Sequence, residues 1–270
     1  MNKTKGKPFL ELFASSLQED YRFPLLEFFA FLYALGTFAF ANIGSIMPTA
    51  SEEQSVYMLV TSITSFPILI FMLLVFKNVA YGLGNDIEKG TIQTIFSYPL
   101  KRRAILTAKL LSAIGVALLV LFGIQIFALI ILAPDMILPY MGTVVLTYAA
   151  NLSFPLLLAS IILFATLLIR KGGLGIVLGI VIYFAISILQ SIALFISMAT
   201  RSALSLQMLA GFNPSIALQY HYGAFAAYLT GEIIWAPTIE EVLAYVGAGY
   251  LAVAIVLSLC YYFFSRRLNL

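Results

Sequence analysis

The chain has 270 residues with a net charge of +3; 62% of them are hydrophobic and only 10% are charged. A soluble domain carries about 25% charged residues. This composition, with a mean hydropathy of +1.02, therefore excludes a water-soluble globule and predicts an all-helical polytopic membrane protein. One cysteine and one histidine exclude a cysteine-rich metal site, and the small, scattered charge excludes a nucleic-acid footprint.

The first predicted element is an amphipathic helix over residues 8–22. Phe9, Phe13 and Leu17 recur at helical spacing, while polar residues occupy the other side. An ordinary polar lead-in would not segregate in this way. The pattern predicts an N-terminal elbow helix that lies along the membrane surface.

Six apolar runs exceed the ~18 residues expected of a membrane-spanning helix. They cover 23–46, 56–80, 104–132, 142–169, 172–198 and 242–264.

The stretch 200–241 contains a further apolar region that resembles a seventh span. Asn213 and Pro214 interrupt it, and a seventh crossing would move Arg266 to the other side of the membrane from the remaining basic residues. We therefore expect short external helices here, interfacial or partly re-entrant, before the sixth span.

The lysines and arginines orient the chain. Of the 15, only Arg201 falls on the side opposite to the others. Because basic residues gather on the cytoplasmic side, both termini and residues 81–103 are predicted to be cytoplasmic, with 47–55 and 200–240 outside. The expected location is the cell (plasma) membrane.

The spans offer little chemistry. Carboxylate pairs and Ser/His or Glu/His pairs are missing from the predicted spans, so the sequence predicts neither a catalytic residue nor a metal site. The candidates for a solute path are the hydroxyl and amide groups of Thr61, Ser65, Ser187 and Gln190. Buried Ser and Thr usually bond back to their own helix, so both interpretations stay open.

The loop between the second and third spans is the densest cluster of charged and special residues. Asn85 and Glu88 have the spacing of a capping box, and Pro99 stops the following helix. Ile92, Ile95 and Phe96 give the predicted 85–99 helix an apolar face. An apolar face on the cytoplasmic side is typical of a contact with a protein partner.

This loop resembles the permease subunits of ABC-2-type ABC exporters. Their pattern is acid-x-acid-x-Gly-Thr, a short aliphatic helix, Ser/Thr-x-Pro, basic residues and a following lysine. The matching residues are Asp86, Glu88, Gly90, Thr91, Ser97, Pro99, Arg102, Arg103 and Lys109. The elbow helix, the six spans and the external segment fit the same family, and Asp86 stands where Glu is commoner.

The resemblance implies one ABC-2-type transmembrane domain over 1–270, working as a homodimer or heterodimer with two copies of a separate ATP-binding subunit. ATP and Mg would bind that subunit, because this chain has no G-x-x-x-x-G-K-[ST] sequence and no cofactor of its own. The family's coupling helix docks on the ATPase. Here that role would fall to Asp86, Glu88, Gly90, Thr91, Ile92, Ile95, Phe96, Pro99, Arg102 and Arg103.

Three functions follow from these observations. The first is the membrane subunit of an exporter or flippase, whose uncharged path would suit a lipid or apolar drug better than a small ion. The second is a mechanotransmission or assembly role in which the ATPase drives an external protein and no solute crosses. The third, a secondary carrier, is disfavoured because the spans hold almost no charge. The sequence does not identify a substrate.

Overall fold

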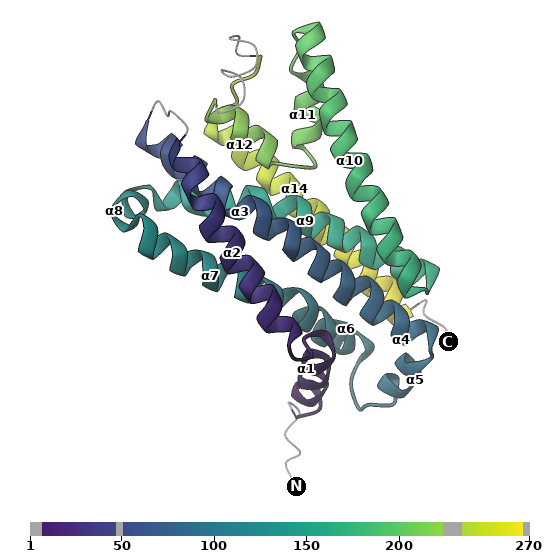
Figure 1. The fold of residues 1–270 in the computed structure, drawn as a ribbon. Helices are drawn as coiled ribbons and strands as arrows, with labels where there is room; N and C mark the ends of the chain where they lie inside the picture. Colours follow the sequence, from purple (N-terminus) through teal and green to yellow (C-terminus); the bar gives the residue numbers. More distant parts are fainter. Residues whose placement is uncertain (1–6, 47–50, 224–233, 267–270) are drawn as a thin grey trace.

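The computed structural model describes residues 7–46, 51–223 and 234–266, and the regular elements in these ranges are helices (Figure 1). Three stretches consist of consecutive segments: α3 Glu52–Phe76, η1 Lys77–Leu83 and α4 Gly84–Glu88; α6 Arg102–Leu110, η2 Leu111–Val116 and α7 Ala117–Leu132; α8 Pro134–Ile137, η3 Leu138–Tyr140 and α9 Met141–Ile169. The other helices are α1 Lys7–Asp20, α2 Leu25–Ile46, α5 Thr91–Phe96, α10 Gly172–Thr200, α11 Leu204–Ala210, α12 Ser215–His221 and α14 Ile239–Arg266.

The long helices match the predicted spans. Among the described residues, five stretches are long and apolar enough to cross a membrane: Glu52–Glu88, Arg102–Leu132, Pro134–Ile169, Gly172–Thr200 and Ile239–Arg266. The pair α1 and α2, bent by 67°, makes a sixth if it is counted as one span. The predicted spans from 56–80 onward each fall inside one of these stretches, and the first falls largely on α2. These helices support a multi-pass membrane protein.

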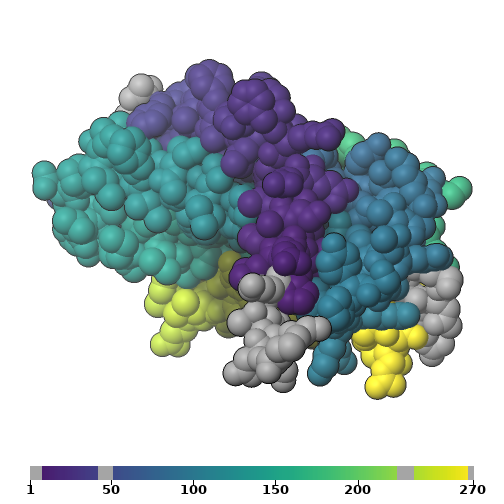
Figure 2. Space-filling model, turned by 90° about the horizontal axis from the view of Figure 1, so that it is seen from below, coloured from purple at the N-terminus to yellow at the C-terminus, as the bar shows by residue number. Residues whose placement is uncertain are grey.

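Helix α1 occupies the predicted elbow, but its apolar side faces the protein. Leu12 and Tyr21 are buried, and Phe13 and Leu17 pack against the same core. Leu10 of the same helix is 62% exposed. Figure 2 shows α1 lying across the face seen from below, beside the blue residues that follow α4. Packing on α6 and η2 explains the amphipathic pattern, and contact with a membrane surface stays a prediction.

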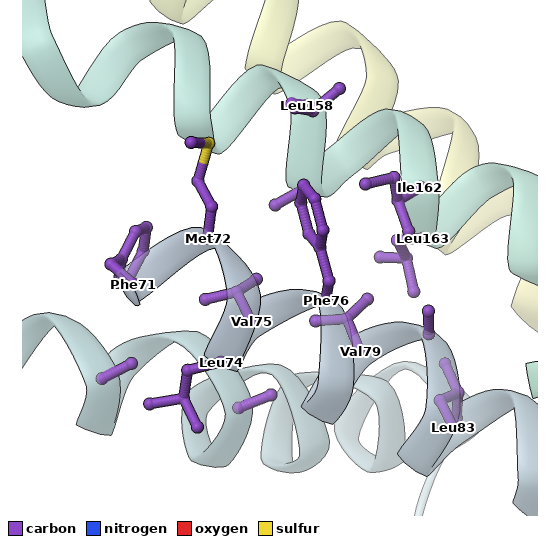
Figure 3. Close-up of a cluster of buried hydrophobic side chains, with 14 of the residues drawn as sticks. Phe71, Met72, Leu74, Val75, Phe76, Val79, Leu83, Leu158, Ile162 and Leu163 are labelled. Carbon is purple, nitrogen blue, oxygen red and sulfur yellow. The ribbon is translucent and has the colours of Figure 1, made fainter. Parts of the chain in front are cut away.

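The main core lies where α3 and η1 cross α9. Phe76 and Val79 face Leu158, Ile162 and Leu163 of α9 in Figure 3. Inside a bilayer, burial against protein gains little over burial in lipid, so close packing of side chains holds such a contact together.

Small residues let α10 approach this core. A Cβ atom on Gly175 would lie 2.5 Å from Thr166 Oγ1, and one on Gly179 would lie 2.6 Å from Ile162 Cδ1. The Gly-x-x-x-Gly pattern therefore serves packing within the chain.

Short helices occupy the described part of 200–241, as predicted. Helices α11 and α12 have seven residues each, too few to span a bilayer. Trp235 then packs between the rings of Tyr220 and Tyr245, with centroid distances of 5.7 and 5.8 Å. Residues 224–233 of this segment, 47–50 of the predicted external loop, and the chain ends 1–6 and 267–270 lie outside the described residues.

Candidate functional site

Residues 84–103, which we call the α5 segment, form a turn at one end of the bundle (Figure 1). The prediction of a single helix over 85–99 that begins at Asn85 is wrong. Asn85 lies inside the continuous helix Glu52–Glu88, because the chain passes through a π-helical stretch without a break. The helix ends at Glu88, and the chain then turns at Gly90, whose φ of +75° is a left-handed conformation that glycine adopts without strain. A shorter helix, α5, then runs to Phe96, and Pro99 follows it.

The apolar side of α5 faces its own chain. Ile92 is fully buried, and Ile95 and Phe96 pack against the main core. The Phe96 ring meets Phe264 edge to face at 5.6 Å, and the Arg102 guanidinium lies 4.6 Å above the Phe96 ring. The prediction that the apolar side of this helix contacts a protein partner is thus wrong for Ile92, since its side chain is already buried within the chain. The exposed residues, which a partner can reach, are Glu88, Lys89, Thr91, Gln93, Thr94, Ser97, Tyr98, Pro99, Lys101, Arg102 and Arg103.

Asp86 lies inside this end of the bundle. It forms a salt bridge with Lys109, whose ammonium also lies 3.4 Å from the Glu19 carboxylate. The side chains of Asp86 and Lys109 are only 7% and 11% exposed. The assignment of Asp86 to the surface that docks on the ATPase therefore needs correction, because its carboxylate is buried and pairs with Lys109 within the chain. Glu88 remains exposed.

A second buried carboxylate, Asp20, lies beside this ion pair. Asp20 is the last residue of α1, and the axis of α1 is bent by 67° from that of α2. Ser112 donates a hydrogen bond to its carboxylate, and the Lys77 ammonium donates one of 2.8 Å to its backbone carbonyl. Burial raises the pKa of Asp20 to about 6, and the hydrogen bond from Ser112 and the charges of Lys109 and Lys77 only partly oppose this.

These polar groups surround two π-helical stretches that contact each other. The stretch Lys77–Leu83 joins α3 to α4, and Leu111–Val116 joins α6 to α7. π-Helical turns are rare and are frequent at functional sites. The buried charges, the two π-helical stretches and the exposed α5 segment therefore gather at one end of the molecule, which we call the α5 end.

The four candidate solute-path residues line one cavity. Thr61, Ser65, Ser187 and Gln190 border a volume of about 280 Å³ between α3, α9 and α10. Ser65 donates a hydrogen bond to Thr61 O at 2.6 Å, and Ser187 donates one to Tyr183 O at 2.9 Å, so these hydroxyls bond back to their own helices as well. Every lining residue that the structure describes is uncharged.

Sequence reasoning missed the other amides of this cavity. Asn151 lines it from α9, Asn213 from the turn before α12, and Ser215 from the first turn of α12. Ser215 donates a hydrogen bond of 2.7 Å to Asn213 Oδ1. An asparagine in the middle of an apolar helix was the available signal for Asn151, because its amide needs partners that the helix does not supply.

At the opposite end of the bundle, which we call the α12 end, hydrogen bonds around Tyr222 join α3 to α9 and to the end of α12. The Glu53 carboxylate accepts from the Tyr222 hydroxyl at 2.9 Å and from Thr143 at 2.7 Å. Gln54 donates to the Tyr222 carbonyl at 2.7 Å, and the Tyr57 and Tyr222 rings stack at 4.6 Å. The first turn of α3 thus holds the end of α12.

Within the described ranges, no cluster of three or more His, Cys, Asp or Glu residues is placed to hold a metal ion. No family model matches the chain, and no curated protein is significantly similar to it.

Proposed function

We propose that the chain is the permease subunit of an ATP-driven exporter or flippase of the ABC-2 type, in the plasma membrane. Two copies of an ATP-binding subunit, which carry ATP and Mg, would bind the α5 end in the cytoplasm. The observation that supports this most is the continuous helix Glu52–Glu88. It borders the polar cavity through Thr61 and Ser65 and ends at the exposed α5 segment.

The residues of the α5 segment take different roles in this proposal. Glu88, Thr91 and Thr94 form the docking surface, with Arg102 and Arg103 on its flank. Ile92, Ile95 and Phe96 join the segment to the bundle core. Because α5 is fixed to the core, a displacement of the docking surface would move the whole end of the bundle.

Asp86 acts as an internal anchor of this docking site. Its ion pair with Lys109 fastens α4 to α6, and Lys109 reaches α1 through Glu19. Breaking a buried ion pair is costly, so these three helices should move as one unit.

The second permease subunit would cover α10. Phe184, Ile188 and Phe195 are all more than half exposed on this helix. The polar cavity borders α10 through Ser187 and Gln190, so the dimer would place two such cavities near its interface. Uncharged hydroxyl and amide groups suit a lipid or another amphipathic solute, because they offer no compensation for a buried ion.

Sidedness is tested by labelling. Cysteines introduced at Ser51 and Ser97, both exposed, should react with a membrane-impermeant maleimide from opposite sides of sealed vesicles. Cys260 is buried and serves as the background control. Labelling of both positions from the same side would refute the orientation.

Transport is tested in liposomes that contain the permease with its ATPase. A fluorescent phospholipid and a hydrophobic dye serve as probes, and one of them should stimulate ATP hydrolysis. Gln190→Leu should weaken that stimulation roughly fivefold, the loss expected for one hydrogen bond of about 1 kcal/mol. Ser191→Ala is the control, because Ser191 bonds its own helix and does not border the cavity. Equal effects of the two substitutions would remove the cavity from the path.

A second candidate function is force transmission to an external protein. The observation that favours it is that the Glu52–Glu88 helix also carries Glu53 and Gln54, which hold the end of α12. ATP hydrolysis that responds to an external protein and to no solute would identify this function.

A further inference from the structure

A long apolar groove runs along the side of the bundle formed by α7, α9 and the turn between them. Leu129, Val144 and Leu152 are buried and form its floor. Its rim includes Ile126, Ile130 and Val145, which are 51, 63 and 61% exposed. The groove has a volume of about 700 Å³. Apolar cavities of about 150 Å³ already hold a benzene molecule, so a much longer apolar group fits here.

The length of the groove matches one leaflet of a bilayer. Its α9 wall extends from Met141 to Leu152, which is a rise of about 16 Å along the helix at 1.5 Å per residue. Half of a hydrocarbon core of about 30 Å is about 15 Å. The groove ends at the α8–η3 turn, where the hydroxyl of Tyr140 donates a hydrogen bond of 3.2 Å to Glu52. Tyrosine is common at the level of the lipid headgroups, so this turn marks the membrane surface.

The position of the groove also identifies its occupant. Helices α7 and α10 lie on opposite sides of the bundle (Figures 1 and 2). If α10 faces the second permease subunit, which is part of the proposed function, the α7 side faces lipid. We infer that the groove between α7 and α9 is a binding site for an acyl chain of a phospholipid in the outer leaflet.

The shape of the groove favours stable binding of an acyl chain. Tyr250 of α14 closes its inner side and is fixed there by a hydrogen bond of 3.1 Å from its hydroxyl to Ala149 O. Each buried methylene of a lipid chain adds to binding, and a concave wall buries more methylenes than a convex helix surface. A bound phospholipid should therefore exchange more slowly than the surrounding lipid.

The test uses the full chain in phosphatidylcholine vesicles that contain a small fraction of phosphatidylcholine with a photoreactive diazirine on its acyl chain. Peptides of α7 and α9 that line the groove should be labelled in preference to other lipid-facing helix surfaces. Val145→Trp should reduce this labelling roughly tenfold, the change expected when about two buried methylenes are displaced. Ile255→Trp is the matched control, because Ile255 is 54% exposed on α14 and does not line the groove.

Labelling of the groove no stronger than that of other lipid-facing surfaces would overturn the inference. A crosslink between two copies of the chain through Val145→Cys would overturn it in favour of a subunit interface. The experiment needs no ATPase, so labelling in the groove can succeed even if the proposed transport function fails.

Discussion

The two ends of this helical bundle are held together by different interactions. At the α5 end, the buried ion pair of Asp86 and Lys109 joins α4 to α6, and Asp20 of α1 accepts a hydrogen bond from Ser112. At the α12 end, hydroxyl and amide groups surround a partly exposed Glu53. Removing one partner of a buried ion pair costs about 3–5 kcal/mol, whereas a typical hydrogen bond contributes about 1 kcal/mol.

This difference suggests how a motion would pass through the molecule. The α5 end should behave as a rigid body, since separating its helices would leave a buried charge without its partner. The α12 end can open by exchanging its hydrogen bonds for water at little cost. The Glu52–Glu88 helix would then transmit a displacement of the α5 segment to the α12 end. There the displacement would break hydrogen bonds around Tyr222.

The largest effect is expected from breaking the ion pair at the α5 end. Lys109→Met leaves Asp86 buried without its partner and should destabilise the protein by about 3–5 kcal/mol. Thermal unfolding in detergent measures the change, and Lys171→Met at an exposed position is the control. Adding Asp86→Leu to Lys109→Met should restore most of the loss, because an apolar pair replaces a buried ion pair without penalty. If Lys109→Met were as stable as Lys171→Met, the result would contradict a rigid α5 end.

A smaller effect is expected from Asp20, and it depends on pH. The pKa of Asp20 is raised from 3.8 to about 6 in the folded protein, so folding favours the protonated carboxyl. Its stabilising contribution is fully present below about pH 4 and is lost as the pH rises through about 6. At about 1.4 kcal/mol for each pKa unit, the loss amounts to roughly 3 kcal/mol.

Asp20→Asn stays neutral and can still accept the hydrogen bond from Ser112. Its stability relative to the parent chain should therefore increase between pH 4 and pH 7. Glu19, Lys77 and Lys109 face Asp20 and remain in both proteins. Parallel stability profiles of the two proteins would contradict a buried carboxyl with a raised pKa.

The smallest effect is expected at the α12 end. Tyr222→Phe keeps the ring stacked on Tyr57 but removes the hydroxyl that donates to Glu53. The expected loss is about 1.5 kcal/mol, the lower end for a hydrogen bond to a charged group, because Thr143 still donates to Glu53. Tyr262→Phe, at a 52% exposed position, is the control. A loss as large as that for Lys109→Met would remove the contrast between the two ends.

The long helices were predictable from sequence because an apolar run of more than about 18 residues is typical of a membrane-spanning helix. The continuity of Glu52–Glu88 was not predictable, since Asn85 and Asp86 are polar and lie beyond the apolar run 56–80. The pairing of Asp86 with Lys109 joins residues 23 positions apart on separate helices, which no local pattern reveals. Removing Asp86 and Glu88 together should therefore disturb folding, because Asp86 is buried.

The cavity was partly predictable. Thr61, Ser65, Ser187 and Gln190 were chosen as hydroxyl and amide groups on two apolar helices, and they do border one space. Asn151 was overlooked because its helix reads as a plain span. The Asn213 contribution depends on how the turn before α12 folds over the cavity, which only the tertiary structure defines.

The central claim is that the exposed side of α5 docks on an ATPase, and a photo-crosslinker at Thr94 tests it most directly. Thr94 is exposed on α5, so a crosslinking amino acid there should leave the fold intact; the same amino acid at Ser51, on the α12 end, is the control. In native membranes, the Thr94 position should capture a polypeptide that carries a G-x-x-x-x-G-K-[ST] sequence, and the Ser51 position should not. ATP hydrolysis should copurify with the Thr94 product. Capture of no such polypeptide at Thr94, or equal capture at Ser51, would contradict the proposed function.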